Sequence, residues 1–114
     1  MARRPEILRF KRDFDRLYKK GRSTGDKFIV VFHIPNGRDY SRRAFLASKK
    51  VGGAVERNRA RRLMKEGFRK IESELLPGKD ILFIARKEIV SDGTGSGEID
   101  LSIRKALSKS GLLR

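Results

Sequence analysis

The chain has 114 residues, enough for one domain, and its 29 lysines and arginines against 14 acidic residues give a formal charge of +15. Because such a charge opposes compaction by self-repulsion, the composition predicts a polyanionic partner and favours nucleic acid over an anionic membrane. The lack of cysteine excludes disulfides and thiolate metal sites, and a single histidine argues against a zinc site. No apolar run is long enough for a signal peptide or a bilayer span, so we predict a cytoplasmic protein without a membrane role.

Residues 1–6 predict a loose basic arm, and the segment after them predicts an amphipathic helix. Its apolar residues recur at positions i, i+4, i+7 and i+8, which are Phe10, Phe14, Leu17 and Tyr18. Gly21 is typical of a helix end. We expect Phe10 to belong to the core.

Three apolar stretches predict β-strands. Residues 27–34 and 42–48 are separated by the turn signal Pro35-Asn36-Gly37, so we expect them to form a hairpin, with Phe28 in the core. Residues 80–86 form a continuous apolar run, which is typical of a strand covered on both faces.

Two further helices are expected, one from about residue 54 to about residue 75 and one from about residue 98 to residue 109. Residues 91–97, rich in glycine and serine, predict a flexible loop between the last strand and the last helix. No repeat or linker is visible, so we expect a single domain over residues 1–114 with an α+β sandwich fold.

The longer helix from residue 54 has an apolar face and a basic face at 100° per residue. The apolar face comprises Ala60, Leu63, Met64, Gly67, Phe68, Ile71 and Leu75. The basic face comprises Asn58, Arg59, Arg61, Arg62, Lys65 and Arg69, with Arg57 at its border. Most charged helix faces are only solvated, but here few cations have an i,i+4 acid, and they crowd the first half, where the helix dipole disfavours them. The excess of arginine, which grips phosphate in a bidentate fork, favours a phosphate partner.

The stretch SKKVGGAVERNRARRLMKEGFRK, residues 48–70, resembles the signature of the bacterial ribonuclease P protein component, Ser-Lys-Lys-x-Gly-x-Ala-Val-x-Arg-Asn-Arg-x-x-Arg. The matching residues are Ser48, Lys49, Lys50, Gly52, Ala54, Val55, Arg57, Asn58, Arg59 and Arg62. RDFDRLYKKGRS and DILFIARK resemble the first helix and last strand of the family, so the resemblance covers nearly the whole chain. Gly53, Arg61 and Gly67 depart mildly from the pattern, and we expect Gly67 to allow close packing on the sheet.

The resemblance implies a small mixed sheet of about four strands flanked by three helices, in the order αβββαβα, similar to ribosomal proteins. It also implies a left-handed strand-helix-strand crossover, which is rare. The implied function is that of the protein subunit of ribonuclease P, which binds a catalytic RNA subunit and precursor tRNA and assists removal of the 5′ leader. The chemistry is implied to reside in the RNA with its Mg²⁺, so we assign the protein no catalytic or metal residue and expect no obligate protein partner.

The resemblance also implies two binding surfaces. The predicted contacts with the RNA subunit are Lys49, Lys50, Arg57, Asn58, Arg59, Arg61, Arg62 and Lys65. The predicted contacts with the leader are Phe14, Tyr18, Phe32, Arg86 and Lys87, because a single strand is held by aromatic stacking and a cationic groove. His33 stands alone and is expected to be structural or exposed.

Two alternatives stay open at this point. A ribosomal protein that binds ribosomal RNA structurally would share the small size and the basic composition. A stand-alone nuclease would need paired histidines or clustered carboxylates, and the acidic residues of this chain are scattered among cations.

Overall fold

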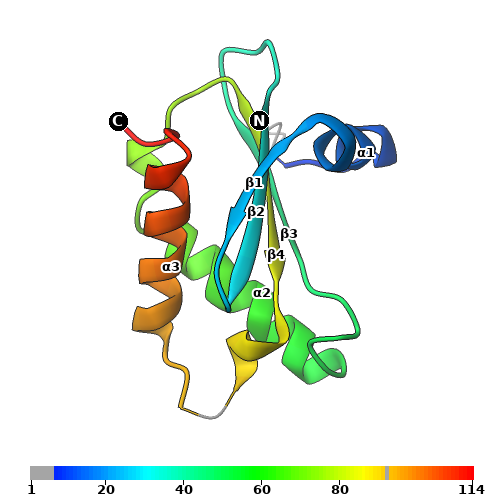
Figure 1. Cartoon of the computed structure of the whole chain (residues 1–114), viewed down its shortest axis with the longest axis vertical. Coiled ribbons are helices and arrows are strands. Elements are labelled where there is room, and N and C mark those ends of the chain that lie inside the picture. The colour runs from blue at the N-terminus through cyan, green and yellow to red at the C-terminus, as the bar shows by residue number, and fades with distance from the viewer. Residues whose placement is uncertain (1–6, 92) are drawn as a thin grey trace, which may run out of the picture.

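The computed structural model describes residues 7–91 and 93–114, which form three helices around a four-stranded sheet (Figure 1). The helices are α1 (Lys11–Lys20), α2 (Ala54–Arg69) and α3 (Ser96–Lys109). The strands are β1 (Arg22–Gly25), β2 (Ile29–Pro35), β3 (Arg42–Leu46) and β4 (Lys79–Ala85), and short 3-10 helices span Glu72–Glu74 and Lys87–Val90. This confirms the α+β prediction with four strands. The predicted basic arm, residues 1–6, lies outside the described residues.

The sheet has the order β1-β2-β4-β3, antiparallel except for the parallel pair β3 and β4. The predicted hairpin is therefore wrong, because β4 lies between β2 and β3. The physical reason is burial: β4 is covered on both faces, as its apolar run predicts, and takes a central position. The parallel strands β3 and β4 are connected through α2, and the left-handed sense of that connection stays a prediction.

One face of the sheet packs against α2 and α3 and forms the larger core (Figure 1). The side chains that α2 buries there are Ala60, Met64, Gly67 and Phe68, as its periodicity predicts. The helix ends at Arg69, earlier than expected, but Ile71 and Leu75 continue the same core through the 3-10 turn that follows. Phe28 is buried in this core, which confirms its prediction.

The other face of the sheet carries α1 and a smaller core (Figure 1). This core contains Leu8, Leu17, Ala44 and Leu82, with Phe14, Phe32, Ile34 and Ile84 packed against it. Phe10 was expected in the core but is 58% exposed. It precedes the first turn of α1 and lies under the Arg12 guanidinium, so the buried stripe of the helix begins later than the spacing suggested.

Gly67 lies where α2 crosses α3. A Cβ added there would stand 2.8 Å from Cδ1 of Ile103 and 2.9 Å from Oδ1 of Asp100. The expectation of close packing is confirmed, but the neighbour is α3 and not the sheet. The helix α3 itself begins at Ser96, inside the segment 91–97 that was predicted as a loop.

Candidate RNA interface

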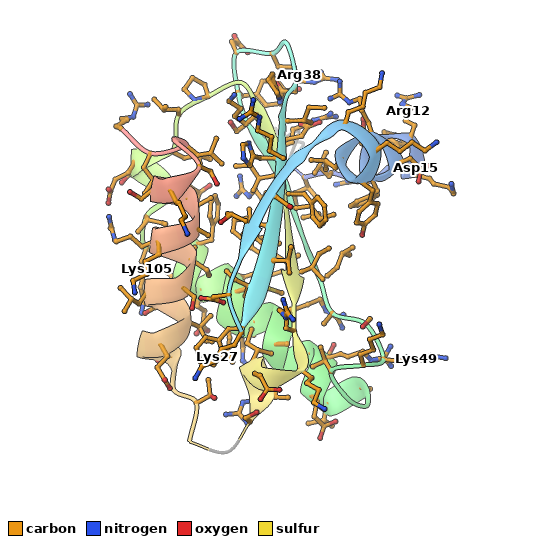
Figure 2. The ribbon with its side chains drawn as sticks, in the orientation of Figure 1. Arg12, Asp15, Lys27, Arg38, Lys49 and Lys105 are labelled. Atoms are coloured by element: carbon orange, nitrogen blue, oxygen red, sulfur yellow. The ribbon has the colours of Figure 1, made fainter. Side chains whose placement is uncertain are left out.

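The basic face of α2 is open to solvent. Asn58, Arg59, Arg62 and Lys65 are exposed, and Arg57 and Arg61 are half-buried. Lys49 and Lys50 extend the surface from the exposed turn before the helix, where Figure 2 shows Lys49 projecting away from the ribbon. The structure thus places all eight predicted RNA-subunit contacts on and beside the first three turns of α2.

These cations lack acidic partners within the described residues. No described carboxylate lies within ion-pair distance of the five cations that α2 contributes, Arg57, Arg59, Arg61, Arg62 and Lys65. The Arg57 Nε donates to the Gly53 carbonyl at 3.4 Å, and Arg61 donates to the side-chain oxygen of Asn58. Asn58 therefore braces a neighbouring guanidinium. Since cations at a helix N-terminus also oppose the helix dipole, this surface is electrostatically suited to a bound polyanion.

The N-terminus of α2 is capped by a hydrogen bond between its own backbone and the carboxylate of Glu56. Gly53 is the N-cap, and its N–H donates to Glu56 Oε1 at 3.0 Å. Glu56 is therefore engaged at the cap, so its charge supports the first turn of the helix.

The predicted aromatic residues meet between α1 and the sheet. The rings of Tyr18 and Phe32 are edge to face with centroids 5.3 Å apart, and Tyr18 is 48% exposed. Phe14 and Phe32 are half-buried against the smaller core. Tyr18 therefore presents an accessible ring that the sheet holds in place.

A groove of about 520 Å³ runs from α1 across β3 to α2. Phe14 lines its α1 side, and Lys65 and Arg69 line its α2 side. The groove thus joins residues of both predicted surfaces. Its floor includes Ala44 and Leu46 of β3, which sequence reasoning missed. The available signal was the period of two in a strand, which puts Ala44 and Leu46 on the same face of β3.

The structure separates Arg86 and Lys87 from the aromatic residues. Both are exposed and follow the end of β4, where the Arg86 N–H donates to the Phe28 carbonyl at 2.8 Å. Phe32 pairs with Leu82, four residues before Arg86. At the usual rise per strand residue this separates them by about 13 Å along the strand.

A buried charge network holds α1 on the sheet. Asp80 is fully buried and accepts bonds from Arg42 Nε at 2.8 Å, from Arg42 Nη2 at 2.6 Å and from Asn36 Nδ2 at 3.0 Å. Arg16 and Asp13 of α1 join it, at 3.2 Å to Asp80 and 3.4 Å to Arg42. Burial alone would raise the pKa of Asp80, but the bonds from Arg42 and Asn36 and the nearby cations hold it below its ordinary value. This network could not be predicted from local patterns, because its members are far apart in the chain.

Residues 7–91 and 93–114 contain no group of three His, Cys, Asp or Glu side chains able to hold a metal ion. Among these same residues, no helix is long and apolar enough to cross a membrane. His33, expected to be structural or exposed, is 8% exposed.

The fold and the unpaired cations of α2 define a small, strongly basic α+β protein with a surface suited to a polyanion. The sequence pattern of the family described as Ribonuclease P matches residues 2–110. The ribonuclease P protein component of Clostridioides difficile is 43% identical over 98 residues, 85% of this chain and 84% of that protein. That of Caldanaerobacter subterraneus subsp. tengcongensis is 37% identical, over 92% of this chain and 89% of that protein.

Solved structures agree with the sequence relatives. A Staphylococcus aureus RNase P protein superposes with a TM-score of 0.84 at 31% identity, covering 97% of this chain and all of that one. A Thermotoga maritima RNase P protein gives a TM-score of 0.79 at 31% identity, covering 88% of this chain and 93% of that one. The chain belongs to the bacterial ribonuclease P protein family.

Proposed function

We propose that this protein binds the catalytic RNA subunit of ribonuclease P through α2 and the 5′ leader of precursor tRNA through Phe14, Tyr18 and Phe32. In this role it assists endonucleolytic removal of the leader, which gives the mature tRNA 5′ end. The observation that carries the proposal is the solvent-open arginine face of α2, which has no carboxylate partner among the described residues.

The arginine face supports backbone binding because each guanidinium can bind a phosphate in a bidentate fork. Asn58 and Arg61 already share a hydrogen bond, so this pair is preorganised beside Arg57 and Arg62. Neutralising RNA phosphates releases condensed counterions, so affinity should fall steeply with salt.

The aromatic residues Phe14, Tyr18 and Phe32 and the groove that Phe14 lines, which together we call the aromatic groove, support leader binding. Tyr18 is exposed enough to stack on a base, and its contact with Phe32 fixes the orientation of the ring. Because the groove beside Phe14 continues to Lys65 and Arg69, a strand that stacks on α1 would pass toward the RNA bound at α2. Arg86 and Lys87 would touch only a more distant part of the substrate.

Bond cleavage is assigned to the RNA subunit, whose Mg²⁺ supplies the attacking hydroxide and stabilises the leaving oxygen when bound. The protein contributes by neutralising RNA phosphates and by positioning the precursor tRNA. Under this proposal the protein works in the cytoplasm, where its two RNA partners meet.

The test is reconstitution with a bacterial ribonuclease P RNA at low Mg²⁺, followed by cleavage of a precursor tRNA. We expect stimulation by the protein. Arg59→Ala and Arg62→Ala should each weaken binding of the RNA subunit and lower its salt slope by about one ion. Tyr18→Ala should instead reduce the advantage of a substrate with a leader over one without. An identical defect in both kinds of variant would contradict the two-surface proposal.

A separate assay tests whether the protein cleaves RNA without the RNA subunit. One solved Staphylococcus aureus relative, with a TM-score of 0.85 and 32% identity, is described as an RNase P protein mutant with defective mRNA degradation activity. We expect our protein alone, with Mg²⁺, to leave precursor tRNA intact. Specific cutting that survives removal of contaminating RNA would overturn the assignment of chemistry to the RNA, and lack of stimulation in the reconstitution would contradict the proposed role in leader removal.

A further inference from the structure

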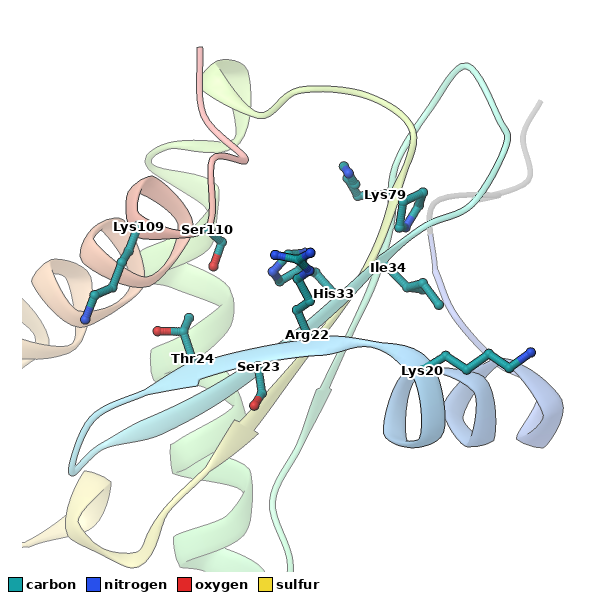
Figure 3. Close-up of a pocket in the computed structure, with 10 residues that line it drawn as sticks. Lys20, Arg22, Ser23, Thr24, His33, Ile34, Lys79, Lys109 and Ser110 are labelled. Carbon is teal, nitrogen blue, oxygen red and sulfur yellow. The ribbon is translucent and has the colours of Figure 1, made fainter.

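A second concentration of cations lies away from α2 and from the aromatic groove. It surrounds a hollow of about 590 Å³ at the β1 edge of the sheet (Figure 3). The residues that matter for its chemistry are Arg22, Thr24, His33, Lys79, Lys109 and Ser110, which we call the β1-edge pocket. They come from β1, β2, β4 and the C-terminal end of α3, so only the folded chain brings them together.

The strand register explains why this pocket exists. Arg22 is paired with His33, and His33 is paired with Ile81 of β4. Directly paired residues share a face of the sheet, so Arg22 and His33 lie on the face that is apolar core at Val31 and Ile81. Because α3 ends at Lys109, it leaves this end of the face uncovered.

The pocket concentrates positive charge without acidic compensation. None of the described residues that line it is acidic, and Arg22, Lys79 and Lys109 have no ion pair with a described carboxylate. Arg22 on β1 and Lys79 on β4 have β2 between them, and Lys109 lies at the end of α3, so these like charges repel one another around the hollow. The arrangement therefore opposes folding, and nothing in the described part of the chain offsets it.

His33 provides a second observation that points to a ligand in this pocket. Its side chain is 8% exposed, and its Nδ1 has no hydrogen-bond partner among the described residues. Burial, and then the charges of Lys79 and Arg22, lower the pKa of His33 below its ordinary value. The groups that face it are Arg22 on β1, Lys79 on β4, and Lys109 and Ser110 at the end of α3, which Figure 3 shows across the hollow. Lys20, at the end of α1, is a further cation in the lining.

We propose that the β1-edge pocket binds a phosphate group of RNA, as a contact separate from α2 and the aromatic groove. This inference rests on the proposed function, which supplies an RNA partner. A phosphate would neutralise Arg22, Lys79 and Lys109, and the hydroxyls of Thr24 and Ser110 can donate to its oxygens. The groove lies at the β3 edge of the sheet and this pocket at the β1 edge, which is the opposite edge in the strand order, so the pocket would hold a phosphate apart from the RNA segment in the groove.

The test is the double variant Arg22→Gln/Lys79→Gln, which leaves α2 and the aromatic residues unchanged. The matched control is Arg12→Gln/Lys27→Gln, which also removes one arginine and one lysine, from exposed positions outside the pocket (Figure 2). Affinity for RNA is measured over a range of salt. We expect the pocket variant to bind about tenfold more weakly, with a salt slope lower by about 0.7–0.9 for the one phosphate lost, and the control to change by less than about threefold.

Two arms identify the source of the phosphate. A loss seen with the RNA subunit alone assigns it to that subunit, and a loss seen only when precursor tRNA is added assigns it to the substrate. Equal effects of the pocket and control variants in both arms would overturn the inference. In the same assay, Arg59→Ala tests the proposed function. If Arg59→Ala weakens RNA binding and the pocket variant does not, the phosphate site is contradicted and the proposed function is not.

A second readout does not depend on affinity. Inorganic phosphate is titrated into the wild-type protein and the pocket variant, and the pKa of His33 is followed by NMR. Phosphate in the pocket should raise that pKa in the wild type and have a much smaller effect in Arg22→Gln/Lys79→Gln. No change in the wild type would contradict an anion beside His33.

Discussion

Asp80 is the residue on which the placement of α1 depends. Its buried carboxylate binds Arg42 through both oxygens, and Arg16 reaches it from α1. Breaking a buried pair by removing one partner leaves the other charge uncompensated, which costs about 3–5 kcal/mol. Since Tyr18 and Phe14 are on the same helix, the network also positions the proposed leader surface.

We predict that Asp80→Asn lowers the free energy of unfolding by about 3 kcal/mol at neutral pH. Because the folded-state pKa of Asp80 is lowered, its contribution is present above the unfolded pKa of about 3.9 and is lost as the pH falls through the folded value. Urea unfolding of the wild type should therefore show stability falling in this acid window, and Asp80→Asn should show a shallower fall.

The matched control is Asp15→Asn, which breaks the exposed pair with Lys11. Exposed pairs contribute little, so the change should be within about 1 kcal/mol. Two outcomes would show that the network does not hold α1. One is an equal loss of stability in the two variants, and the other is the same acid-dependent fall in stability in Asp80→Asn as in the wild type.

The exposure of a residue could be predicted from the sequence where a single helix or strand determines its environment. The cations of α2 were placed correctly because helical periodicity alone puts them opposite the core. Phe10 was misplaced because its exposure depends on where α1 begins. His33 and Asp80 needed the register of three strands, which no local pattern contains.

The contact between α2 and α3 depends on the small size of Gly67. A Cβ at this position would meet the ends of two side chains, Ile103 and Asp100, which can rotate. Alanine also gains about 1 kcal/mol in helix propensity, so Gly67→Ala tests the contact poorly. A longer side chain cannot be accommodated this way, because Ile103 is fully buried.

We predict that Gly67→Leu lowers the free energy of unfolding by about 1–3 kcal/mol, since overpacking forces the helices apart. Glu66→Leu, at the exposed neighbouring position, is the control and should change stability by about 0.5 kcal/mol or less. Thermal and urea unfolding measure both. A neutral or stabilising Gly67→Leu would mean that α3 does not pack as closely as described.

The elements were largely predictable, but their pairing was not. Apolar runs and helical periodicity located β2, β3, β4 and all three helices, whereas β1, a four-residue strand of Arg, Ser, Thr and Gly, has no apolar signal. The expected hairpin followed from the turn at Pro35-Asn36-Gly37. It fails because β4, the most buried strand, takes the place beside β2.

The whole molecule carries a formal charge of +15 within principal dimensions of 40 × 32 × 29 Å. At about 0.01 M salt the Debye length is about 30 Å, comparable with the molecule, so almost all its cations repel one another. At about 0.15 M the Debye length is about 8 Å, and only neighbouring charges interact. Folding brings the charges together, so screening stabilises the folded state more than the unfolded chain.

We therefore predict that the midpoint of thermal unfolding rises as NaCl increases from about 0.01 M to about 0.15 M. A gain of about 1 kcal/mol would raise it by about 4–8 °C in a domain of this size. Asp80→Asn removes a buried negative charge and should leave this salt response in place, because the repulsion comes from the whole surface. Phosphate should stabilise more than NaCl at equal ionic strength, through exclusion from the surface and, under our inference, through occupation of the β1-edge pocket, and Arg22→Gln/Lys79→Gln should reduce that excess. A midpoint that is constant or falls with salt would mean that the cations are already compensated within the folded chain.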